Sequence, residues 1–188
     1  NKMPTTIQPF KALRYNADKV STDKVICPPY DVLNETLADK LMNQSPYNSI
    51  FISYNVDKQT GQNKYKHFPE RIKEWKEKEI LVEDTKPSFY ILEEKFVHEG
   101  QSKTRLGVFA LIPVSQNKNI IPHEKIFTDA VTDRLHLLET TKTHISPIFL
   151  VSEDPEQQLT NWLQKQKSNA DEINYKYPND HIDYKLGT

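Results

Sequence analysis

Apolar residues recur every three or four positions in four stretches of the chain, the spacing that places them on one side of a helix. The first stretch spans residues 33–42, with Asn34 as a candidate N-cap. The second runs to about Lys78 and begins at Pro69 or about one turn earlier, since proline is favoured in the first turn of a helix. Its aromatic stripe is expected in the core and consists of Tyr65, Phe68, Ile72 and Trp75. The third is expected to have Thr128 as its N-cap, and the fourth to start at Asp154-Pro155. The pattern therefore predicts four helices.

Short runs of β-branched and aromatic residues predict strands between and beside these helices. Gly100 lies in a short polar link and indicates that residues 88–97 and 104–114 form a hairpin. Both faces of the second hairpin strand are apolar, so we expect it at the centre of a sheet, with Gly107 marking a close approach of backbone or ligand. Residues 7–15 are expected to form a strand or an extended arm. The other expected strands lie at residues 25–27, 49–54, 145–151, 173–177 and 182–186.

Helices and strands alternate along the chain, but the hairpin interrupts the alternation. This order favours an α+β (mixed α/β) fold, with a mixed sheet that has a central hairpin flanked by helices. We expect a main domain at residues 1–154, followed by a helix and short strands at residues 155–188 that lead toward a further part of a larger protein.

The composition narrows the class of protein without naming a ligand. The chain has 188 residues and a net charge of −1, so no strong global field favours nucleic acid or an anionic membrane. Cys27 is the only cysteine and cannot form an internal disulfide, which suits a cytoplasmic protein. No apolar stretch in the sequence is long enough to predict a membrane span, and nothing in the sequence decides the oligomeric state.

Several well-known catalytic motifs are missing from the sequence. The four glycines show neither the GxGxxG nor the GxxxxGK spacing of phosphate-binding loops. The six histidines form no HExxH zinc motif. Cys27 lies beside prolines with no adjacent histidine, so a structural thiol is favoured over a nucleophile. The sequence predicts no metal site.

Residues 120–150 gather more proton-transferring and anion-pairing groups than any other stretch. His123 and Glu124 follow a proline, and together they suit proton transfer near neutral pH. Lys125 and Arg134 suit an anionic group of a ligand, with Asp133 between them in the sequence. The alternative is a charged helix face in water, with Asp129 or Asp133 paired locally to a basic neighbour. The apolar stripe of this helix consists of Val131, Leu135 and Leu138, and Leu137 widens it.

Two further segments provide candidate site residues. Pro28 and Pro29 stiffen a turn that displays Tyr30 and Asp31 in a fixed direction, either toward a ligand or as a lid on the core. Ser146 lies at the start of the expected strand 145–151 and is a candidate for binding a substrate or phosphate group. We therefore name Asp31, His123 and Glu124 as catalytic candidates, and the ligand-binding candidates are Tyr30, Lys125, Asp133, Arg134 and Ser146.

A series of short motifs resembles a known family. In chain order they are IQPFKALRYN, VICPPYDVL, SPYNSI, RLGVFALI, IPHEK, DRLHLLETT and SPIFL. Together they resemble the domain-of-unknown-function 1015 family of bacterial and archaeal proteins, from residue 7 to about residue 154 and thus the N-terminal part only. Where the family often has a threonine soon after PHE, this chain has Ile126-Phe127-Thr128.

The resemblance implies a function that the residues alone do not. Full-length members carry a later ADGHHR-type motif, not found in these 188 residues, that is similar to the ParB/sulfiredoxin superfamily. Some proteins of that superfamily bind nucleotides or phosphorylate small substrates such as serine. The resemblance thus implies a phosphotransferase that uses ATP or ADP with Mg²⁺ in the full-length protein. The alternative is a non-catalytic ligand-binding or regulatory module, and we expect no nucleic-acid or membrane partner.

Overall fold

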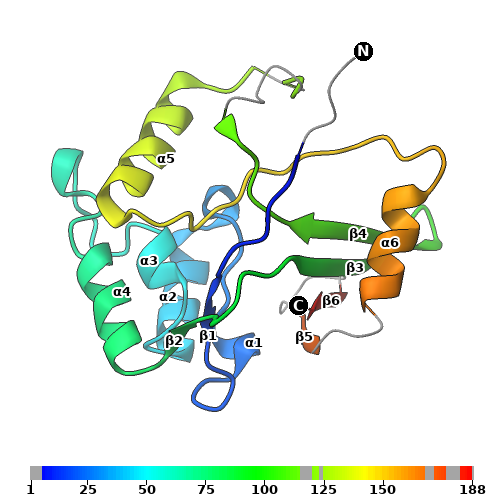
Figure 1. Ribbon diagram of the computed structural model, residues 1–188. Helices are drawn as coiled ribbons and strands as arrows, with labels where there is room; N and C mark the ends of the chain where they lie inside the picture. Colours follow the sequence, from blue (N-terminus) through cyan, green and yellow to red (C-terminus); the bar gives the residue numbers. More distant parts are fainter. Residues whose placement is uncertain (1–5, 115–119, 123–124, 168–171, 177–182, 188) are drawn as a thin grey trace. The chain divides into compact units, whose positions relative to one another are not determined.

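The chain forms two compact units, each built from separate segments of the sequence. The computed structural model describes residues 6–114, 120–122, 125–167, 172–176 and 183–187 (Figure 1). Unit 1 combines residues 1–12, 83–122 and 150–188, and unit 2 combines residues 13–82 and 123–149. Helices and small sheets occur together, so the α+β class is confirmed. The expected domain boundary at residue 154 stays a prediction.

Unit 2 is mainly helical. Its two short strands pair with each other, and most of its helices are gathered in the left half of Figure 1. The elements in chain order are β1 (Leu13–Tyr15), α1 (Thr22–Val25), a 3-10 turn (Tyr30–Val32), α2 (Glu35–Gln44), α3 (Ile50–Ser53), a second 3-10 turn (Gly61–Asn63), α4 (Phe68–Glu77), β2 (Leu81–Glu83) and α5 (Thr128–Thr141).

The core of unit 2 is built around aromatic residues of α4 and of the segment that precedes it. Tyr65, Phe68, Ile72 and Trp75 are all buried, as the helical spacing predicted. Proline lies in the first turn of α4, which confirms the expected start of this helix. These residues pack into one cluster with Ile52, Ile80, Leu81 and Leu137. A second cluster joins Ala38, Leu41 and Ile50.

The start of α2 also agrees with the sequence. The side chain of Asn34 accepts a hydrogen bond of 2.9 Å from the backbone N–H of Leu37. This bond satisfies one of the N–H groups that the first turn of a helix leaves unpaired. The expected N-cap is therefore confirmed.

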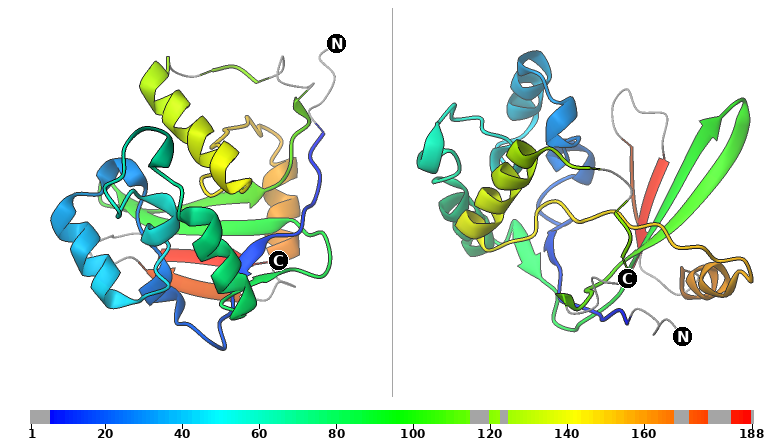
Figure 2. Two further views of the ribbon diagram at one scale, coloured as in Figure 1. Left: turned by 90° about the vertical axis from the view of Figure 1, so that its left-hand side faces the viewer. Right: turned by 90° about the horizontal axis from the view of Figure 1, so that it is seen from above.

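Unit 1 contains a four-stranded sheet in the order β4-β3-β6-β5. The long strands β3 (Tyr90–His98) and β4 (Gln101–Phe109) form the predicted hairpin, drawn as a long green pair beside β6 in Figure 2. The two turn residues, Glu99 and Gly100, both have positive φ, which gives a turn whose twist matches that of the flanking strands. The expected C-terminal strands are confirmed as β5 (Glu172–Lys176) and β6 (Asp183–Gly187).

Helix α6 (Gln158–Lys167) packs against this hairpin. Trp162 meets Phe89 edge-on with ring centroids 6.0 Å apart, and Lys167 pairs with the buried Glu93 of β3. The helix begins later than the expected Asp154-Pro155 start. Asp154 lies before it and accepts hydrogen bonds from the backbone N–H groups of Leu159 and Thr160, so it acts as a distant cap.

The prediction of a strand at residues 49–54 is wrong, because residues 50–53 form the short helix α3. Ile50 belongs to the second core cluster and Ile52 to the first, so α3 lies between two apolar clusters that cover both of its sides. The buried side chain of Asn48 accepts a hydrogen bond of 3.0 Å from the N–H of Ile50 and holds the first turn. Tertiary packing therefore overrides the β-propensity of the sequence.

Three other strand predictions are also wrong. Residues 25–27 continue from the end of α1 as extended backbone without strand pairing, and residues 145–151 lie outside any strand, with Ile148 and Val151 each 85% exposed. Strand β4 is at the edge of its sheet and not at the centre. A Cβ added to Gly107 would meet nothing within 4 Å, so no other backbone segment described in the structure approaches this glycine closely, and the approach of a ligand stays a prediction. Apolar composition alone did not reveal which segments find a pairing partner.

Candidate functional site

Helix α5 presents a different face to the core than its apolar pattern predicted. Val131 and Leu135 are 48% and 51% exposed, whereas Leu137 is 3% exposed. Asp133 and Arg134 are half-buried. Leu137 of the expected stripe is therefore confirmed as a core residue, but Val131 and Leu135 are not, because Asp133 and Arg134 turn toward the chain before α4. Thr128 is the first helical residue and not the N-cap.

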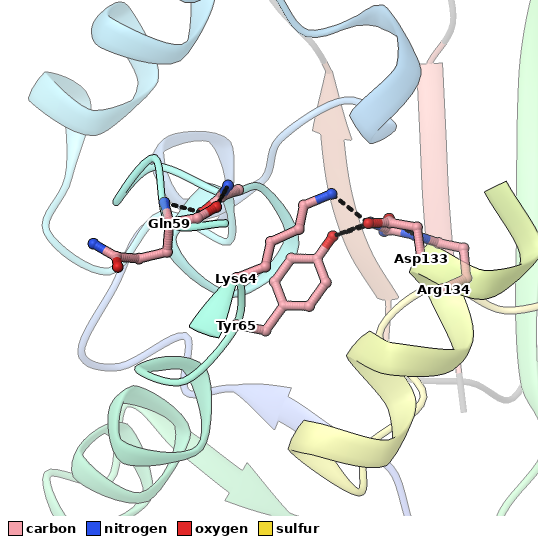
Figure 3. Close-up of polar contacts among 6 residues, drawn as sticks. Gln59, Lys64, Tyr65, Asp133 and Arg134 are labelled. Atoms are coloured by element: carbon pink, nitrogen blue, oxygen red, sulfur yellow. Dashed lines mark hydrogen bonds and ion pairs between the residues drawn. The ribbon is translucent and has the colours of Figure 1, made fainter. Parts of the chain in front are cut away.

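The inward-facing polar residues of α5 form a cluster with residues from two other segments of unit 2. We call it the Arg134 cluster, and it consists of Tyr30, Lys64, Tyr65, Asp133 and Arg134. Figure 3 shows Lys64 and Tyr65 reaching toward Asp133 and Arg134 on α5. Local structure explains this approach, since the 3-10 turn Gly61–Asn63 ends at Lys64 directly before the buried Tyr65.

Asp133 is the acceptor at the centre of the cluster. Its carboxylate pairs with the ammonium group of Lys64 and with the guanidinium group of Arg134. The hydroxyl of Tyr65 lies 2.8 Å and 2.9 Å from the two carboxylate oxygens and donates to them. Asp133 therefore has its negative charge balanced and its oxygens occupied within the protein.

Arg134 is held on several sides. Its Nη2 donates to the Tyr65 hydroxyl over 2.8 Å, and its Nε donates to Asp133 over 3.0 Å. The ring of Tyr30 stacks on the guanidinium group, with 3.9 Å between the ring centroid and Cζ. Such stacking is favourable because the face of an aromatic ring is electron-rich.

The turn that carries Tyr30 is shaped by the two prolines before it. Pro29 has φ −54 and ψ 148, an extended conformation that proline favours, and the N–H of Val32 then bonds to its carbonyl oxygen. The expectation that this turn gives Tyr30 a fixed direction agrees with its contact to Arg134.

One donor of Arg134 has no partner among the described residues. Its Nη1 is buried and donates to no acceptor among them. Arg71 in the same unit provides a contrast: its Nη1 and Nη2 both donate to Asp57, and Nη1 also donates to the carbonyl oxygen of Phe51. The two side chains are similarly buried, at 23% and 24% exposed. Since buried polar groups are normally paired, the free Nη1 distinguishes Arg134 from an ordinary structural arginine.

The cluster favours fixed charge states at neutral pH. Burial raises the pKa of the Asp133 carboxyl, but hydrogen bonds from Lys64, Arg134 and Tyr65 outweigh burial and hold this pKa below its usual value. Burial opposes the charge of Lys64, yet its bonds to Asp133 and Tyr65 raise its pKa overall. Burial, followed by the bond to Asp133, raises the pKa of the Tyr65 phenol. The site thus presents a carboxylate, an ammonium ion and a neutral phenol.

The structure brings together only some of the residues that the sequence singled out. Tyr30, Asp133 and Arg134 meet in the Arg134 cluster. Asp31, Lys125 and Ser146 are exposed and are not members of this cluster. His123 and Glu124 lie outside the described residues, so their expected part in proton transfer stays a prediction.

Sequence reasoning missed Lys64 and Tyr65 as members of the site. Tyr65 had been assigned to the core by its place in an aromatic stripe, and its ring is indeed buried. A buried tyrosine hydroxyl normally finds a polar partner, and this general rule was the available signal. Which partner it finds, 68 positions away in the chain, depends on the fold.

Other kinds of site are not seen in the described part of the chain. Within it, no three histidine, cysteine, aspartate or glutamate side chains are grouped so that they could hold a metal ion. The described helices also include none with the length and apolar character needed to cross a membrane.

Comparison with known proteins supports one assignment. No curated protein and no solved structure gives a significant match to the chain. The family described as protein of unknown function (DUF1015) matches residues 7–185. The resemblance therefore covers nearly the whole chain and does not end near residue 154, which corrects the expectation of an N-terminal match only. On this match, the chain belongs to the DUF1015 family of proteins of unknown function.

Proposed function

We propose that unit 2 binds the anionic group of a small-molecule ligand at the Arg134 cluster. The observation that carries this proposal is the buried Nη1 of Arg134, which has no partner among the described residues. A guanidinium group is a preferred partner for carboxylate and phosphate groups, and burial strengthens such a bond by excluding water. Lys64 adds a second positive charge beside it.

Calorimetric titration of the protein with ATP, ADP, inorganic phosphate and serine tests this proposal. We expect at least one of them to bind, and Arg134→Gln to weaken that binding by about tenfold or more, the size of one lost charge-assisted hydrogen bond. Arg71→Gln is the matched control, because Arg71 is equally buried and stacks on Phe51 and Phe68 but has its nitrogens paired. Equal losses of ligand affinity in the Arg134→Gln and Arg71→Gln variants, or no binding by the wild type, would contradict the proposal.

The finer proposal is that the anion-binding unit belongs to a nucleotide-using small-molecule phosphotransferase of the serine-kinase type. It is supported by the motif resemblance to the family and by the presence of two cations in one site. In such an enzyme Mg²⁺ would neutralise nucleotide phosphates, and Arg134 and Lys64 would orient an anionic group of the substrate. Formation of a phosphorylated product from ATP and serine, lost in Arg134→Gln, is the expected result.

A specific observation favours the alternative of a non-catalytic binding module. Asp133 is the one carboxylate within the Arg134 cluster, and it is occupied by Lys64, Tyr65 and Arg134. A general base needs a free lone pair directed at the proton it takes. If His123→Ala and Glu124→Ala retain ligand binding and no phosphorylated product forms with any variant, the chain is a binding module.

A further inference from the structure

The charge balance of the Arg134 cluster narrows the class of ligand. We propose that the group bound there is a monoanion, such as a single carboxylate, and not a dianion such as a phosphate or sulfate. This inference rests on the proposed function, because it specifies the ligand of the same site.

The first argument is a count of the charges in direct contact. Lys64 and Arg134 contribute two positive charges and Asp133 contributes one negative charge, which leaves one positive charge in excess. All three side chains are largely buried, with exposures between 20% and 35%. Charges in such surroundings are stable only when they are balanced. One negative charge on the ligand achieves this balance, whereas a dianion leaves an uncompensated negative charge beside Asp133.

The second argument concerns the geometry of the free donor. A guanidinium group holds a carboxylate or a phosphate most firmly when two neighbouring nitrogens donate in parallel. Asp133 occupies Nε and Nη2, and the Tyr65 hydroxyl also accepts from Nη2. Among the described contacts of Arg134 only Nη1 lacks an acceptor, so the side chain offers a ligand one nitrogen and no fork. A single carboxylate oxygen suits this donor.

The surroundings of the cluster do not alter the charge count. The imidazole of His136 packs against the Tyr65 ring, with 5.6 Å between ring centroids. Asp31 and Lys125 are exposed, so water and salt screen their charges.

The test is a nuclear magnetic resonance titration that follows the Nε–H signal of Arg134, assigned by its loss in Arg134→Lys. Acetate represents the monoanion and sulfate the permanent dianion, both at constant ionic strength and neutral pH. We expect acetate to bind about tenfold more tightly than sulfate, the size of one charge-assisted hydrogen bond. The Nε–H signal of Arg71, which is paired with Asp57, reports any general effect of the salts.

Charge variants make the test specific to the proposed balance. Asp133→Asn raises the net charge of the cluster by one, so the preference should invert toward sulfate. The double variant Asp133→Asn with Lys64→Met restores the wild-type net charge and should restore the preference for acetate. Urea unfolding of each variant first establishes that it is folded.

The outcomes separate this inference from the function on which it rests. If sulfate binds the wild type more tightly than acetate, or if Asp133→Asn leaves the preference unchanged, the inference is overturned while anion binding stands. If neither salt moves the Arg134 signal, and ATP, ADP, inorganic phosphate and serine also fail to bind in the calorimetric titration, both proposals fall.

Discussion

At the scale of single residues, the cluster shows how one carboxylate can organise several donors. Asp133 accepts from a lysine, an arginine and a tyrosine that come from two segments of unit 2. Each partner alone would stabilise the fold little if exposed to solvent. Partial burial, and the sharing of one acceptor, make the contacts depend on one another.

The lowered pKa of Asp133 predicts a specific dependence of stability on pH. A carboxyl whose pKa is lower in the folded state adds stability that is present above its ordinary value of 3.8 and is lost as pH falls through the folded pKa. We therefore expect wild type and Asp133→Asn to differ most at neutral pH, and the difference in unfolding free energy to shrink as the pH falls below 3.8. Urea unfolding measured across this range provides the test.

Asp31→Asn is the control for this series, because Asp31 is an exposed carboxylate on the turn. Its unfolding free energy should follow that of the wild type at every pH. A gap between wild type and Asp133→Asn that stays constant down to strongly acidic pH would show that the carboxylate charge has no part in stability.

Asn48 is a second residue with a role that sequence position alone does not reveal. Its buried amide donates to the carbonyl oxygens of Lys24 and Ile26, over 2.9 Å and 3.1 Å, and accepts from the N–H of Ile50. We expect Asn48→Ala to cost about 2–3 kcal/mol of unfolding free energy, because it leaves the buried N–H of Ile50 and two partly buried carbonyl groups without this partner. Asn34→Ala, which removes an exposed cap, should cost about 1 kcal/mol. Equal costs in thermal or urea unfolding would contradict this ranking.

At the scale of elements, α5 illustrates the limit of apolar periodicity. Helix α4 buries the stripe that its spacing predicts, but α5 exposes Val131 and Leu135. The reason is that α5 contributes both Leu137 to the core and Asp133 and Arg134 to the polar cluster, and one rotation of the helix must satisfy both contacts.

This orientation predicts opposite outcomes for two leucines on the same helix. Leu137→Ala should lower the unfolding free energy by about 2–4 kcal/mol, because it leaves a cavity among core residues. Leu135→Ala should change it by about 0.5 kcal/mol or less, since Leu135 is half-exposed. Urea unfolding of both variants measures the difference, and a larger loss for Leu135→Ala would mean that α5 packs with its other face.

At the scale of the whole molecule, the even balance of charge argues against binding to nucleic acid. The 25 basic and 26 acidic residues leave a net charge of −1. Binding to the phosphate backbone depends on concentrated positive charge that displaces counterions. We expect no shift of a random DNA duplex in a gel at about 50 mM salt, conditions that favour such binding. A shift that weakens as salt is raised would overturn this expectation.

The sequence by itself determined the elements whose signals are local. The spacing of Phe68, Ile72 and Trp75 determined the buried face of α4, and Gly100 in a polar link determined the hairpin. These succeeded because a helix face and a tight turn are set by residues a few positions apart.

The tertiary structure decided which distant groups meet. It made α3 a helix between two apolar clusters, left residues 145–151 without a strand partner, and turned Asp133 and Arg134 toward Lys64 and Tyr65. These outcomes depend on burial and pairing between segments far apart in the chain. Such contacts form only when the chain folds, so their contribution to stability cannot be read from a local sequence pattern.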